Sequence, residues 1–189
     1  MEEFTVQKMG NVSVTIVYVN AVTESVLRDR FGEDSPANRI PLRIASGKFF
    51  NGAFSEKLPF RGFHDLLMKM DTIFDYFSFP QRSTEMRSFA EQDLTARLAW
   101  MKESVLPELT QKWGERVVHR GRGDCATFMI HVYARQNCSW QGKIHWLEGN
   151  REGCFRSLLE LMYFMESVLD KGRIKAADES AEMCDECAE

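Results

Sequence analysis

The first strong pattern along the chain is the β-branched segment Val12–Val19, whose side chains alternate across the two sides of an extended backbone. Both sides become apolar after Thr15, which is typical of a strand in the middle of a sheet. The next segment, Thr23–Phe31, predicts a short helix, because Thr23 is a good N-cap residue and Gly32 is a good helix terminator.

A hairpin followed by an amphipathic helix is predicted next. The segment 39–58 contains two apolar-rich runs separated by Ser46 and Gly47, which indicates two strands joined by a turn. From Phe63 to Phe77, apolar residues recur with the spacing of a helix that packs one face on a sheet. A further helix is expected over Glu91–Leu106.

A second hairpin and helix follow in the last third of the chain. The runs 126–136 and 140–147 alternate apolar and polar residues regularly, and Asn137–Ser139 join them. A turn over Gly149–Gly153 then leads to an amphipathic helix over Phe155–Leu169.

The two hairpin–helix units resemble each other in residue order. Phe50–Phe54 (FNGAF) matches Trp140–Ile144 (WQGKI), and both helices share the pattern Phe-x-x-Leu-Leu-x-x-Met. We interpret this as an internal ββα duplication over residues 39–78 and 125–170, although two unrelated amphipathic units can share such a pattern by chance. Either origin predicts a single α+β domain over residues 1–170, with an antiparallel sheet as one layer and helices packed on one of its faces.

Composition narrows the class of protein. The 189-residue chain is 44% hydrophobic and 28% charged, as expected of a packed globular domain, and its segment 171–189 is expected to be an acidic, flexible tail. The net charge of −4 disfavours a dedicated duplex-DNA binder. The first residues show no secretory signal and no apolar run is long enough for a membrane span, so we expect a cytoplasmic protein. Its five cysteines then indicate free thiols.

A candidate binding surface follows from the second hairpin. If the strands pair around Cys138, His131 lies opposite His145 and Tyr133 lies opposite Lys143, on the sheet face away from the helices. Basic, amide and aromatic groups on an open sheet face are typical of surfaces that bind RNA or protein, although an ordinary solvated face has a similar composition. The candidate binding residues are His131, Tyr133, Arg135, Gln141, Lys143 and His145 on the sheet, with Gln81, Arg82 and Arg87 in the loop after the first amphipathic helix.

The sequence offers weaker support for catalysis or metal binding than for a binding surface. His131 and His145 are two neighbouring imidazoles in this register, which suits half a metal site or an acid-base pair, but no carboxylate completes a triad. Cys184 and Cys187 have the spacing of half a zinc knuckle, but no second pair accompanies them. We therefore assign no catalytic residue, metal or cofactor, and keep a small hydrolase or nuclease that uses the His pair as the alternative function.

The segments Arg135–Trp146 (RQNCSWQGKIHW) and Phe155–Leu161 (FRSLLEL) resemble a recurrent pattern in small uncharacterised proteins of clostridia-type bacteria, and Leu58–Phe89 resembles the other half of that family. The resemblance implies a bacterial cytoplasm and a mobile-element origin, and it carries over no catalytic residue. We therefore expect a non-enzymatic binding protein that engages a protein or ribonucleoprotein partner, with RNA contacted through a local basic strip. An inhibitor of a host defence nuclease, of the anti-CRISPR kind, is one concrete form.

Overall fold

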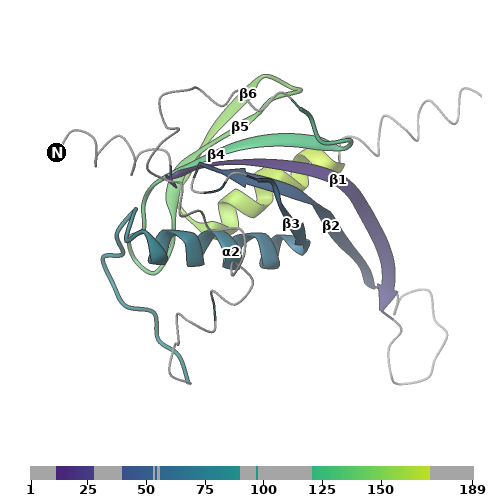
Figure 1. The fold of residues 1–189 in the computed structure, drawn as a ribbon. Coiled ribbons are helices and arrows are strands. Elements are labelled where there is room, and N and C mark those ends of the chain that lie inside the picture. Colours follow the sequence, from purple (N-terminus) through teal and green to yellow (C-terminus); the bar gives the residue numbers. More distant parts are fainter. Residues whose placement is uncertain are drawn as a thin grey trace, which may run out of the picture.

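The computed structural model describes residues 12–27, 40–52, 54, 56–89, 97 and 121–170, which form two layers (Figure 1). One layer is a six-stranded antiparallel sheet in the order β3-β2-β1-β4-β5-β6. The strands are β1 (Val14–Leu27), β2 (Ile40–Asn51), β3 (Leu58–Arg61), β4 (Ala126–Ala134), β5 (Gln141–Trp146) and β6 (Arg151–Phe155). The other layer consists of α2 (Gly62–Tyr76) and a last helix over residues 158–170, on the same face of the sheet. The expected α+β architecture is confirmed.

The central position of the first strand is also confirmed, since β1 pairs with β2 on one side and with β4 on the other. The helix expected over Thr23–Phe31 is wrong for residues 23–27, which continue β1 and pair with β2 from Ile44 to Ile40. The N-cap and terminator signals there are local preferences, and strand pairing with β2 outweighs them. Residues 28–31 of the expected helix lie outside the described residues.

The turn expected at Ser46 and Gly47 is wrong as well, because β2 runs through both residues without interruption. The pairing of β1 with β2 shifts register between Val19 and Ala21, opposite this point. A Cβ atom on Gly47 would lie 1.9 Å from the carbonyl oxygen of Tyr18. Gly47 therefore marks a bulge with a close backbone approach, which is the other common reason for glycine inside a strand.

The second hairpin is confirmed, and Asn137 and Cys138 in its connection adopt positive φ angles of 53° and 55°. The turn expected over Gly149–Gly153 is only partly correct, because the chain turns over residues 147–150 and then forms β6. Phe155 ends this strand and does not begin the last helix, which starts at residue 158.

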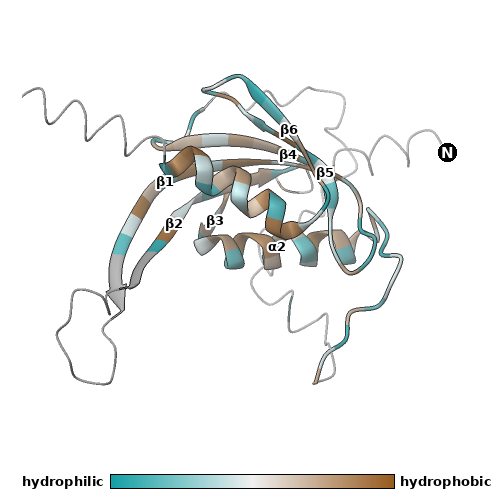
Figure 2. Ribbon diagram, turned by 180° about the vertical axis from the view of Figure 1, so that it is seen from behind, coloured by the Kyte–Doolittle hydropathy of each residue, from teal (hydrophilic) through white to brown (hydrophobic). Residues whose placement is uncertain are grey.

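The core lies between the sheet and the two helices. Figure 2 shows hydrophobic residues along the central strands and on both helices, whereas β6 begins with the hydrophilic residues Arg151 and Glu152. Trp140 is 3% exposed, and its ring meets that of Phe74 edge to face with 5.3 Å between centroids. The fully buried large side chains are Phe49, Phe74, Phe128, Phe155, Leu66, Met70, Ile73, Ile130, Leu161, Met165 and Val17.

The two halves of the described sheet have mirrored strand orders. From the centre outward, β1, β2 and β3 precede α2, and β4, β5 and β6 precede the last helix. Each unit therefore has three strands where the sequence suggested two. The matched residues Phe63 and Phe155 occupy different elements, a helix and a strand, so that alignment is wrong in detail. The internal duplication itself stays a prediction.

Several expected features lie outside the described residues. These are the helix over Glu91–Leu106, apart from Arg97, and the segment 171–189 with Cys184 and Cys187.

Candidate binding surface

The sheet face turned away from the helices is called the outer face below, and it differs between its two halves. Over β1 it is covered at Tyr18, which is 2% exposed and has the Lys57 ammonium 3.7 Å from the centroid of its ring. This burial raises the pKa of Tyr18. Over β4, β5 and β6 the outer face is open, and its side chains are Met129, His131, Tyr133, Lys143, His145, Glu152 and Cys154. We call these seven residues the open half.

Two cross-strand rows organise the open half. In one row, His131 pairs with Lys143, which pairs with Cys154. In the other row, Met129 pairs with His145, which pairs with Glu152. Residues in such rows lie about 5 Å apart at Cβ, so each row presents one continuous strip to a partner.

The register differs from the one expected by two residues. His131 lies opposite Lys143 and is a diagonal neighbour of His145, on the order of 7–8 Å away. The expected pairing assumed a symmetric turn around Cys138, but Trp140 enters the core before β5 begins at Gln141. Because the shift is by an even number of residues, both histidines keep their place on the outer face.

Arg135 was expected on the open face, and this is wrong. Its side chain lies on the helix side, 5% exposed, because the pairing of β4 with β5 shifts register just before it. Its Nε donates a hydrogen bond to the Pro80 carbonyl oxygen at 2.7 Å. Its Nη1 donates to Asp75 Oδ1 at 2.7 Å and to Asp71 Oδ1 at 3.1 Å.

Arg82 and Arg97 complete this cluster, which we call the Arg–Asp network. Arg82 Nη2 donates to Asp71 Oδ2 at 2.5 Å and to Asp75 Oδ2 at 2.6 Å. Arg97 reaches the same two oxygens at 3.1 Å and 2.8 Å. Burial of Asp75 disfavours its ionised form, but hydrogen bonds from Arg82 and Arg135 outweigh burial and lower the pKa of Asp75 below its usual range. The network fastens the loop after α2 and the end of β4 to α2.

Gln141 is also engaged within the protein. Its side-chain amide donates to the carbonyl oxygens of Gln136 at 3.1 Å and Arg156 at 3.3 Å, and its Oε1 accepts from the Gln136 N–H at 2.9 Å. Three of the nine candidate residues, Arg82, Arg135 and Gln141, therefore hold the fold together and are not available to a partner in this arrangement.

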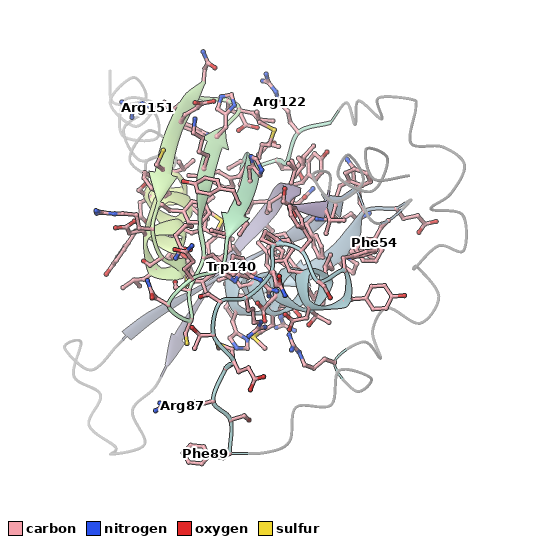
Figure 3. The ribbon with its side chains drawn as sticks, turned by 90° about the vertical axis from the view of Figure 1, so that its left-hand side faces the viewer. Phe54, Arg87, Phe89, Arg122, Trp140 and Arg151 are labelled. Atoms are coloured by element: carbon pink, nitrogen blue, oxygen red, sulfur yellow. The ribbon has the colours of Figure 1, made fainter. Side chains whose placement is uncertain are left out.

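The remaining six candidates are accessible. His131, Tyr133, Lys143 and His145 lie in the open half, where the rings of His131 and Tyr133 meet edge to face at 6.0 Å. Gln81 and Arg87 are exposed in the loop after α2, which also exposes Met86 and Phe89. Figure 3 shows Arg87 and Phe89 far from the two layers, at the end of that loop.

The open half shows no concave site. His145 Nε2 lies 3.3 Å from Asn150 Oδ1, and Glu152 is its cross-strand neighbour. Two hollows among the described residues lie between β6 and the last helix, and Glu152 and Cys154 line them, but neither histidine does. In the same part of the chain, no three His, Cys, Asp or Glu side chains are grouped to hold a metal ion. The geometry therefore does not favour the hydrolase or nuclease that the His pair suggested.

Sequence reasoning missed Met129, Glu152 and Cys154. Met129 alternates with the inward residues Phe128 and Ile130, a signal that was available. Glu152 was placed in a turn, and Cys154 between that turn and the last helix, because β6 was not recognised.

Comparisons of the chain with protein-family models, with curated proteins and with solved structures find no match. No helix in the described ranges is both long enough and apolar enough to cross a membrane.

Proposed function

We propose that this chain is a binding protein that recognises another protein through the open half of its outer face. The observation that carries the proposal is the mixture of exposed side chains there. Met129 is 37% exposed and Tyr133 is 51% exposed, and both lie beside groups that can form hydrogen bonds. Tyrosine and methionine are enriched in protein–protein interfaces, and tyrosine supplies its contact area with little rotamer entropy to lose.

Charge favours a protein over RNA as the partner. Arg135 would have given the outer face a permanent positive charge, but it is buried beside Asp71 and Asp75. Lys143 then carries the permanent positive charge of the open half. Glu152, on the adjacent strand β6 and in the neighbouring cross-strand row, offsets this charge. A sheet that binds single-stranded RNA needs a positive groove in addition to stacking aromatic rings.

An inhibitor of a host defence nuclease is one form that this proposal takes. It would bind the nuclease protein itself, and the loop with Gln81 and Arg87 would extend the contact area. The proposal does not require catalysis by His131 or His145.

The test uses two matched double variants. Met129→Ser with Tyr133→Ser alters the open half, and Met68→Ser with Tyr76→Ser alters the exposed face of α2, where the two residues are each 47% exposed. Both pairs remove one methionine and one tyrosine of similar exposure. Each variant and the parent chain are immobilised and exposed to a bacterial lysate, with and without prior ribonuclease treatment.

We expect the parent and the α2 variant to retain the same protein, and the open-half variant to lose it, whether or not ribonuclease is used. Loss of the protein after ribonuclease treatment would indicate an RNA-mediated contact. Equal capture by all three chains would contradict the proposal.

A further inference from the structure

A groove runs between β6 and the last helix, on the side of the sheet that the helices occupy. It consists of two hollows of about 330 Å³ and about 500 Å³ that share Phe164 and Ser167 in their walls. We call the smaller hollow the slot and the whole feature the edge groove. The slot is lined by Phe128, Ile144, Trp146, Arg151, Glu152, Gly153, Phe164, Ser167 and Val168.

β6 is an edge strand of the described sheet and pairs only with β5 there. In an antiparallel strand every second residue directs its N–H and C=O groups away from its neighbour, so β6 presents backbone groups along its outer edge that pair with no other strand in the described part of the chain. Cys154, Arg151 and Glu152 are exposed on this strand. Such an edge is complementary to the backbone of another extended chain.

Side chains beside this edge are unusually apolar for a surface. Tyr163 is 67% exposed and Phe164 is 38% exposed, and both line the groove from the last helix. The Phe164 ring packs directly on the β6 backbone at Gly153, since a Cβ atom there would lie 2.6 Å from Cζ of Phe164. Gly153 and Phe164 therefore form one continuous wall of the slot, and an apolar side chain that enters the slot would lie against this wall.

One cation stands at the end of the slot. Arg151 shares a cross-strand row with Trp146 and Phe128, which places it on the helix side of the sheet at the start of β6 (Figure 3). It forms no ion pair among the described residues, whereas Arg156 at the other end of the strand pairs with Glu160. An acidic group of a ligand has a partner at Arg151.

We propose that the edge groove binds an extended peptide segment of a partner protein. The segment adds to β6 as a further strand, places one large apolar side chain in the slot, and sets an acidic group beside Arg151. Backbone pairing of this kind supplies affinity, and the slot supplies selectivity for alternate side chains. Glu152 and Cys154 of the open half also line the edge groove, but its apolar lining lies on the helix side of β6, and the proposal does not depend on the function proposed above.

A second copy of this chain fits the groove less well. If two β6 edges paired symmetrically, each would offer the other its helix-side residues Arg151, Gly153 and Phe155. Phe155 is fully buried in its own core, so no apolar side chain would be free to fill the slot. The occupant is therefore a segment with an uncommitted apolar residue.

The first step of the test is selection of a random peptide library, displayed on phage, against the immobilised full chain. We expect enriched sequences with apolar residues at alternate positions and an acidic residue near one end. A synthetic copy of the enriched peptide is then titrated against the parent and against Ser167→Trp, whose indole would occupy the slot. Ser167 is exposed, so this variant is expected to fold.

We expect Ser167→Trp to weaken peptide binding by at least about tenfold, and Arg151→Ala to weaken it less. Methylation of single peptide backbone nitrogens should abolish binding at alternate positions only, because only those N–H groups face β6. Met129→Ser with Tyr133→Ser should bind the peptide like the parent, which separates this site from the open half. Absence of an enriched peptide, equal binding by Ser167→Trp, tolerance of methylation at every position, or a dimer formed through β6 would each overturn the proposal.

Discussion

Replacement of Arg135 by alanine tests the account of the Arg–Asp network. The change removes a guanidinium that is 5% exposed and bonds to Pro80, Asp71 and Asp75. It leaves the Pro80 carbonyl oxygen without that donor, and each carboxylate with two arginines in place of three. The expected result is a clear loss of stability and not a loss of binding alone.

The magnitude follows from what remains after the change. Removing one partner of a buried ion pair typically costs about 3–5 kcal/mol, because the other charge is left uncompensated. Here Arg82 and Arg97 still compensate the charges of Asp71 and Asp75. We therefore expect Arg135→Ala to lower the free energy of unfolding by about 2–3 kcal/mol, at or below the lower end of that range. This is a large share of the roughly 5–15 kcal/mol that stabilises a typical domain.

The assay is urea unfolding followed by tryptophan fluorescence, with Arg87→Ala as the control. Arg87 is exposed, so its removal should change stability by no more than about 0.5 kcal/mol. The stability loss of Arg135→Lys should lie between those of Arg135→Ala and Arg87→Ala, because a single ammonium cannot reproduce the guanidinium fork that bonds to three acceptors. If Arg135→Ala unfolded within about 0.5 kcal/mol of the parent, the buried position of this side chain would be refuted.

Three further predictions concern stability. Trp140→Ala should cost about 3–5 kcal/mol, because the indole is buried against Phe74; a thermal melt like that of the parent would place the indole at the surface. His131→Ala with His145→Ala should change the unfolding free energy by less than about 1 kcal/mol, and a loss several times larger in urea would show that this face is covered. The lowered pKa of Asp75 stabilises the fold above the unfolded-state value of about 3.9, and this contribution is lost as the pH falls toward the folded-state pKa. Below about pH 4, the urea midpoint should therefore fall more steeply with decreasing pH for the parent than for Asp75→Asn. Parallel curves for the two proteins would contradict the lowered pKa of Asp75.

Periodicity alone was sufficient for α2 and for the hairpin of β4 and β5. In each case apolar residues repeat over enough positions to fix the element and its buried face. The last helix was recognised for the same reason, although its start was placed three residues early, at Phe155.

The errors arose where a tertiary contact decided between local alternatives. Gly47 is equally suited to a turn and to a bulge, and only the approach of Tyr18 selects the bulge. β6 contains Gly153 and charged residues that read as a turn, but pairing with β5 makes it a strand.

The Arg–Asp network had a signal that was overlooked. Asp71 and Asp75 are spaced i, i+4 on a helix, and like charges at that spacing repel each other unless cations lie between them. Arg82, a short distance along the chain, was the natural candidate. The contribution of Arg135 depended on a bulge near the end of β4, which no periodicity reveals.

The most direct test of the proposed function is the affinity of the purified partner for matched variants of this chain. The partner captured by the parent would be titrated against Met129→Ser with Tyr133→Ser, and against Met68→Ser with Tyr76→Ser. We predict that the open-half variant binds at least about tenfold more weakly than the parent, and that the α2 variant binds like the parent. Equal affinity of the parent and the open-half variant would contradict the claim that this face recognises a protein.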